Sequence, residues 1–221
     1  MKRFYILMMA ILVACSASFA QDKVRKEREE IRKMAVKDLN RRVDNTVAKE
    51  AKRLAKEGWS VRPGALPLEK QLEKSYLMQY EYDEDLYPKY IMGEATSVGE
   101  NYDAAKTAAM SLALNNLAGQ IQTEVTALIE NTVVNKQLSS EEAMSISETV
   151  MTSKTLISQS LGRTLPIMEC FRKNSKGNTE VLMRIAYSGA MAKKVAADAV
   201  RKQLEEKGNK LSEQLDKILG L

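Results

Sequence analysis

The feature that most constrains the fold is the stretch between residues 90 and 128, which predicts a strand, a turn and a long helix. Residues 90–92 give a short strand signal, and the segment from Gly93 to Gly99 is typical of a glycine-punctuated turn. Beyond it, apolar residues recur at steps of three and four, as they do along one face of a helix. These residues are Met110, Leu114, Leu117, Ile121, Val125 and Leu128. Alanines widen this face and would let the helix lie close against a sheet, at positions 104, 105, 108, 109 and 113.

The same stretch carries a resemblance to a known family. The residues that match are Gly93, Gly99, Asp103, Ala105, Ala109, Ala113, Leu117, Ala118, Gln120 and Ile121. With the Pro-Lys-Tyr-Ile strand ahead of them, they resemble the LPP-twenty family of bacterial surface lipoproteins. They are also similar to the related N-terminal domain of the flagellar T protein. The resemblance covers about residues 88–206 and implies an envelope location and a small α+β fold. It implies no catalytic centre and no active-site residue.

Composition excludes several classes of chemistry. The chain of 221 residues has no histidine, which rules out Ser-His-Asp and Cys-His catalysis and His-ligated zinc. It has two cysteines, Cys15 and Cys170, and the first lies in the leader, so we expect no intrachain disulfide in the exported form. The formal charge of +5 is mild and spread along the chain, so no nucleic-acid partner is expected. We expect no cofactor and no metal site.

Residues 1–20 have the composition of a signal peptide. A positive start is followed by an apolar run over residues 4–14 that is too short to span a bilayer. Two cleavage sites compete. Small residues ending at Ala20 favour a cut before Gln21, whereas the sequence Leu-Val-Ala-Cys ending at Cys15 resembles a lipobox whose cysteine would be lipidated. Either reading predicts an exported protein that is periplasmic or associated with the outer membrane, and lipid-anchored if Cys15 is the mature N-terminus.

The mature chain divides by pattern into four further segments. Residues 21–58 read as one long charged helix with a narrow apolar stripe. Residues 59–87 read as a connector with a short helix over 68–80, because Pro63 and Gly64 mark a turn. Residues 88–207 form the predicted α+β domain. Residues 208–221 carry a last apolar helical piece.

The second half of the domain predicts a helix, a hairpin and a closing helix. The helix is expected over 139–161, with Met144 and Met151 on its buried side. Two strands are expected over 163–172 and 179–187, around the turn-forming sequence Asn-Ser-Lys-Gly-Asn. The closing helix is expected over 188–207, with Met191 inward.

These elements predict an α+β fold. A small antiparallel sheet of three to four strands would be packed by the long Ala-rich helix and further helices, with the charged helix preceding the domain. Cys170 falls in a strand and is expected to be a small buried residue rather than a nucleophile.

Three functions follow as hypotheses. The first is a non-catalytic envelope protein that binds a protein partner through its helices or its sheet edge, or that self-associates through its terminal helices. The basic residues of the segment 21–58 also allow contact with an anionic membrane surface. The second is a cell-wall hydrolase with Glu94 and Glu100 as paired carboxylates. The third is a carrier that holds a small ligand between the sheet and the Ala-rich helix.

Overall fold

The computed structural model describes residues 26, 30, 33, 37, 43–84, 87–134, 139–206 and 215. The chain divides into two compact units, Met1–Val43 and Asp44–Leu221. In the first unit Lys26, Glu30, Lys33 and Lys37 are helical and exposed, whereas Val43 is not helical and is partly buried. The predicted leader, with Cys15, Ala20 and Gln21, lies outside the described residues, as does the C-terminal tail except for Leu215, which is helical and buried. The rest of the description concerns the second unit.

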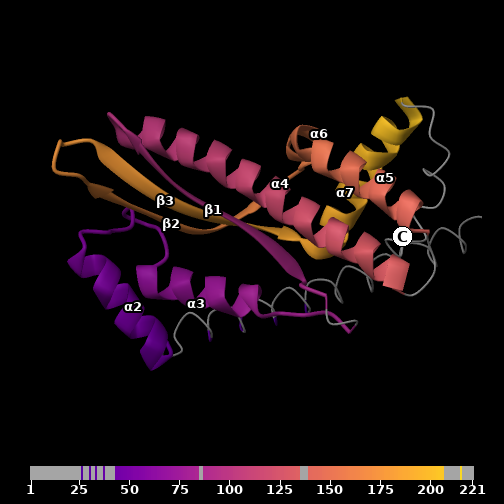
Figure 1. Ribbon diagram of the computed structural model, residues 1–221. Helices are drawn as coiled ribbons and strands as arrows, with labels where there is room; N and C mark the ends of the chain where they lie inside the picture. The colour runs from indigo at the N-terminus through magenta and orange to yellow at the C-terminus, as the bar shows by residue number, and fades with distance from the viewer. Residues whose placement is uncertain are drawn as a thin grey trace, which may run out of the picture. The chain divides into compact units, whose positions relative to one another are not determined.

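The second unit is built on a three-stranded antiparallel sheet. Its strands are β1 (Tyr90–Gly99), β2 (Leu165–Lys173) and β3 (Thr179–Ser188), in the order β1-β3-β2. β2 and β3 form the predicted hairpin, and β1 pairs with the far side of β3. The α+β fold with a small antiparallel sheet is therefore confirmed (Figure 1).

Helices cover both faces of this sheet. One layer contains α4 (Tyr102–Val134), α5 (Ser140–Thr152), α6 (Lys154–Ser160) and α7 (Gly189–Glu206). The opposite face carries α3 (Leu68–Gln79), against which α2 (Asn45–Lys56) packs (Figure 1). Side chains along β1 point alternately towards the two helical layers. Ile91 and Ala95 join the main core beneath α4, whereas Met92 packs with Met78 of α3.

The long helix forms where its periodicity predicts it, but its buried face differs in part from the predicted one, because Met110, Leu114 and Leu128 are only partly buried and Ala104 is exposed. Asn101 caps it, since Asn101 Oδ1 accepts a hydrogen bond of 2.9 Å from the backbone N–H of Ala104. Its buried face repeats mostly every four residues and is made of Ala105, Ala109, Ala113, Leu117, Ile121, Val125 and Ile129. The small residues lie at the start of the helix, nearest the turn that joins it to β1.

The predicted glycine turn from Gly93 to Gly99 is wrong, because both residues belong to β1. Gly93 is required by close packing instead. A Cβ atom at this position would lie 2.2 Å from the carbonyl oxygen of Ala113 and 2.7 Å from Cβ of Leu117. The glycine therefore marks the point where α4 rests on the strand.

The predicted continuous helix over residues 21–58 is also wrong, because Val43 and Asp44 are not helical. Asp44 begins a new helix, α2, by accepting a hydrogen bond of 2.7 Å at Oδ1 from the backbone N–H of Thr46. Part of the predicted apolar stripe lies on this helix. Val47, Ala51 and Leu54 are buried within the second unit.

The helix expected over 139–161 is interrupted at Ser153, which separates α5 from α6. The buried hydroxyl of Ser153 lies 2.7 Å from the carbonyl oxygen of Thr149 and 2.8 Å from Oε1 of Gln203 on α7. From α4, Gln122 Nε2 donates to the carbonyl oxygens of Val150 at 2.7 Å and Met151 at 2.9 Å. These side chains supply hydrogen bonds to carbonyl groups at the break, where the regular helical pattern stops.

Three methionines that were predicted to face inward are exposed. Met144 and Met151 are 71% and 70% exposed, because α5 buries Ala143, Ile146 and Val150 instead. Met191 is 51% exposed, since α7 packs through its alanines and Val200. Among the described helices, none combines the length and apolar character that crossing a membrane requires.

Candidate functional site

The two edges of the sheet differ, and the β2 edge is closed. Phe171 of β2 exchanges two hydrogen bonds with Ser60 of the connector, each 2.9 Å long. The backbone N–H of Glu169 donates to Oε1 of Gln71 at 2.7 Å. Pro166 has no N–H to offer, and the pairing register shifts between Pro166 and Met168. Each of these features prevents a further strand from pairing here.

Side chains from the connector and α4 reinforce this closed edge. The hydroxyl of Tyr102 donates to Glu169, which also forms an ion pair with Lys106 at 2.9 Å. The hydrogen bond to Glu169 raises the pKa of Lys106, and burial raises the pKa of Tyr102. The guanidinium of Arg62 lies 4.6 Å from the centre of the Tyr102 ring. We interpret this cluster as structural.

One hydrogen bond shows which backbone groups of β1 point away from β3. Asn116 Nδ2 of α4 donates to the carbonyl oxygen of Glu94 at 2.8 Å, so this carbonyl points away from β3. In antiparallel pairing the N–H and C=O of one residue point to the same side, and the side alternates along the strand. Met92, Thr96 and Val98 therefore share the outward direction of Glu94. The β2 edge leads to the same assignment. The N–H and C=O of Phe171 point away from β3, so those of Val181, which lies opposite Phe171, point towards β1. Ser97 lies opposite Val181 and therefore points towards β3, which leaves its neighbours Thr96 and Val98 pointing outward.

The β1 edge is open. Within the described part of the chain, the outward N–H and C=O groups of Met92, Thr96 and Val98 make no hydrogen bond. Thr96 is exposed and Val98 is 51% exposed. The strand has no proline, no lysine and no register shift, and Glu94 is its one charged residue. Strand edges that must stay unpaired usually carry a proline, a lysine or a register shift.

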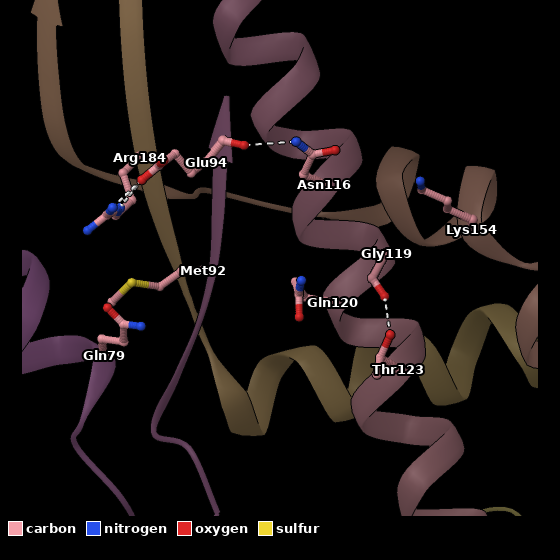
Figure 2. A pocket seen from close by; sticks show the side chains of 9 residues that line it. All are labelled: Gln79, Met92, Glu94, Asn116, Gly119, Gln120, Thr123, Lys154 and Arg184. Carbon is pink, nitrogen blue, oxygen red and sulfur yellow. Dashed lines mark hydrogen bonds and ion pairs between the residues drawn. The ribbon is translucent and has the colours of Figure 1, made fainter. Parts of the chain in front are cut away.

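A cleft of about 500 Å³ crosses this open edge (Figure 2). Residues from both helical layers and from the sheet line it, which places β1 at its middle. They are Gln79 of α3, Met92 and Glu94 of β1, Asn116, Gly119, Gln120 and Thr123 of α4, Lys154 of α6 and Arg184 of β3. The lining is mostly amide, hydroxyl and charged groups, so the cleft is suited to hydrogen-bonding ligands.

Two of the charges in the cleft are bound to each other. Arg184 lies opposite Glu94 in the β1–β3 pairing, and its Nε donates to Glu94 Oε2 at 2.5 Å. Arg184 also donates to the hydroxyl of Ser75 on α3. Lys154 has no ion-pair partner among the described residues and lies beside Gly119, on the α4 side of the cleft (Figure 2).

The structure does not bring the two candidate carboxylates together. Glu94 lies in the cleft and is paired with Arg184, whereas Glu100 follows the last residue of β1. Their Cα atoms are six residue steps apart along a mostly extended chain, or about 20 Å at roughly 3.3 Å per step. The paired carboxylates of glycoside hydrolases lie about 5–10 Å apart.

Between the sheet and the alanine-rich start of α4, the space that a small-ligand carrier would use is filled. Ala105, Ala109 and Ala113 are fully buried against the sheet. The cavity between β1, α4 and α7 measures about 10 Å³, roughly the space of one water molecule.

The described residues contain no cluster of three metal-ligating side chains. Cys170 is buried as expected, and burial raises the pKa of its thiol to about 12.

Sequence reasoning did not single out Asn116 or Lys154, and it identified Glu94 only as a possible acid. Their common place in one cleft depends on strand order and helix packing. The one available signal was the near absence of charge in β1, which reads YIMGEATSVG.

Comparisons with protein-family models, with curated proteins and with solved structures gave no match to this chain.

Proposed function

We propose that this chain is a non-catalytic, exported cell-envelope protein that binds an extended segment of a partner protein as an added strand on β1. The observation that carries the proposal is the difference between the two sheet edges. The β2 edge is closed by Ser60, Gln71 and Pro166, while on the β1 edge, among the described residues, the outward N–H and C=O groups of Met92, Thr96 and Val98 lack hydrogen bonds beside a polar cleft.

Strand addition would use groups that β1 already presents. Met92, Thr96 and Val98 each offer one N–H and one C=O in the geometry that an incoming strand requires. Backbone bonds would supply affinity that is largely independent of sequence. Alternate side chains of the partner would face the α4 layer and the α3 layer, and these contacts would supply specificity.

The non-catalytic part of the proposal rests on residue types. The chain has no histidine, and its candidate acid pair is split between mid-strand and strand end. The resemblance to LPP-twenty lipoproteins, which implies no catalytic centre, points the same way.

The envelope location rests on the leader, residues 1–20. The intact mass of the protein recovered from its native cell tests it. A mass that begins at an acylated Cys15 or at Gln21 supports export, and distinguishes a lipid-anchored protein from a periplasmic one. A mass that still includes residues 1–14 would contradict the proposal.

Strand addition can be tested with a displayed library of peptides about as long as the ten residues of β1. The purified chain is the target, and Thr96→Pro is the edge-blocked variant. Proline at this position removes an outward N–H and leaves the bonds to β3 in place. Thr96→Ala is the matched control.

We expect the selected peptides to bind the wild-type chain and Thr96→Ala with similar affinity, and to bind Thr96→Pro at least about tenfold more weakly, since at least one backbone hydrogen bond and the fit of the strand are lost. Peptides that bind Thr96→Pro equally well, or a selection that yields no binder, would overturn strand addition.

A further inference from the structure

The cleft holds an unbalanced positive charge at one defined point. Glu94 and Arg184 neutralise each other across the β1–β3 pair, which leaves Lys154 as the remaining charged group in the lining. Within the described residues Lys154 forms no ion pair. A bound segment that brought a carboxylate to this point would therefore complete a charge pair without breaking an existing one.

Gly119 keeps the ammonium group of Lys154 accessible from the cleft. A Cβ atom on Gly119 would lie 3.5 Å from Nζ and 3.6 Å from Cε of Lys154, so the lysine side chain rests where α4 has no side chain. Lys154 is partly buried, which restricts its side chain and so lowers the conformational entropy that the side chain loses on binding. Next to it, Thr123 Oγ1 donates to the carbonyl oxygen of Gly119 at 3.1 Å and keeps its lone pairs for a ligand donor.

One face of a strand added to β1 would be turned towards the α4 layer and Lys154. It would lie about 4.8 Å from β1, and every second side chain would face the α4 layer. The α4 residues of the cleft, Asn116, Gln120 and Thr123, are neutral hydrogen-bonding groups, so Lys154 is the group on this side that selects by charge.

We infer that the partner segment carries an aspartate or glutamate at one α4-facing position, and that Lys154 binds its carboxylate. This inference rests on the proposed strand addition and goes beyond it by naming the chemistry of the partner. Lys154 is a specificity-determining residue in this account, while the β1 edge provides the main-chain bonds.

The test compares peptide selections from one displayed library against the wild-type chain, Lys154→Met and Lys154→Arg. The peptides are fused at their C-terminus, so that no terminal carboxylate is available. We expect the wild-type pool to be enriched in Asp or Glu at one position. That enrichment should be lost with Lys154→Met and kept with Lys154→Arg.

A selected peptide and its Glu→Gln (or Asp→Asn) counterpart then measure the effect directly. The wild-type chain should bind the acidic peptide about fivefold more tightly than the amide counterpart, and high salt should reduce the difference. With Lys154→Met the two peptides should bind equally.

The outcomes separate this inference from the proposed function. A pool that depends on an unblocked Thr96 but shows no acidic preference would overturn the inference and leave strand addition standing. An acidic preference that persists in Lys154→Met would also overturn the inference, because another group would then bind the carboxylate. Binding of a second copy of this chain through paired β1 edges, seen as dimers in sedimentation, would replace the acidic segment as the occupant. Absence of any binder would overturn both proposals.

Discussion

Gly93 and Gly119 lie in adjoining elements and have different reasons to lack a side chain. At Gly93 the backbone of α4 occupies the place of a Cβ atom, whereas at Gly119 the nearest atoms belong to the flexible end of Lys154. In a sequence, a glycine beside a strand pattern can indicate either a turn or a close approach between backbones. This ambiguity explains why the sequence predicted a turn where β1 continues.

The first prediction compares the same substitution at these two positions. Gly93→Ala should destabilise the chain by about 1–3 kcal/mol or more, because the added methyl group meets backbone atoms that cannot move aside. Gly119→Ala should stabilise it by up to about 1 kcal/mol, since alanine is the better helix residue and meets only ordinary contacts. Urea unfolding of both variants measures the difference. Equal effects of the same sign would contradict the close contact between β1 and α4.

The second prediction concerns the thiol of Cys170. Burial disfavours the thiolate and raises the pKa of the group from 9.0 to about 12. The folded chain should therefore leave Cys170 unmodified by iodoacetamide at pH 8, while urea-unfolded chain reacts readily, as peptide mass mapping would show. Because the unfolded thiol ionises first, this group should lower folding stability as pH rises from about 9 towards 12. Rapid alkylation of the folded chain at pH 8 would contradict the burial.

At the scale of elements, periodic segments were predictable and their interruptions were not. The four-residue steps of α4 and the turn between β2 and β3 are local signals, and both elements form as expected. The break at Ser153 has no proline or glycine to announce it. It depends on Gln203 and Gln122, which reach it from other helices. Sequence patterns record neighbours along the chain, and these contacts are made across it.

The third prediction tests the alternation of hydrogen bonds along β1. Ser97→Pro should lower the free energy of unfolding by about 2 kcal/mol or more, because the N–H of Ser97 points towards β3 and proline removes it. Thr96→Pro should cost about 1 kcal/mol or less, since its N–H points outward. Thermal or urea unfolding of the two variants gives the comparison. A larger loss in Thr96→Pro would mean that the assigned phase of the strand is inverted.

At the scale of the whole molecule, the candidate site is a property of strand order. β1 is first along the chain and lies at one edge, because the hairpin of β2 and β3 pairs with it through β3. The connector and α3 then close the β2 edge, and the β1 edge remains open beside the cleft. The sequence indicated the strands, the long helix and the absence of histidine chemistry. It could not indicate which edge would be left unpaired, since that depends on the assembled layers.

The most direct test of the open edge is residue-resolved amide hydrogen exchange along β1, in dilute free protein and with a selected peptide. In the free chain the amides of Met92, Thr96 and Val98 should exchange rapidly, while those of Gly93, Ala95 and Ser97 should be protected by their bonds to β3. Binding of the peptide should slow exchange at Met92, Thr96 and Val98. Protection of these outward amides in the free monomer, or exchange that stays rapid with the peptide bound, would contradict strand addition at this edge.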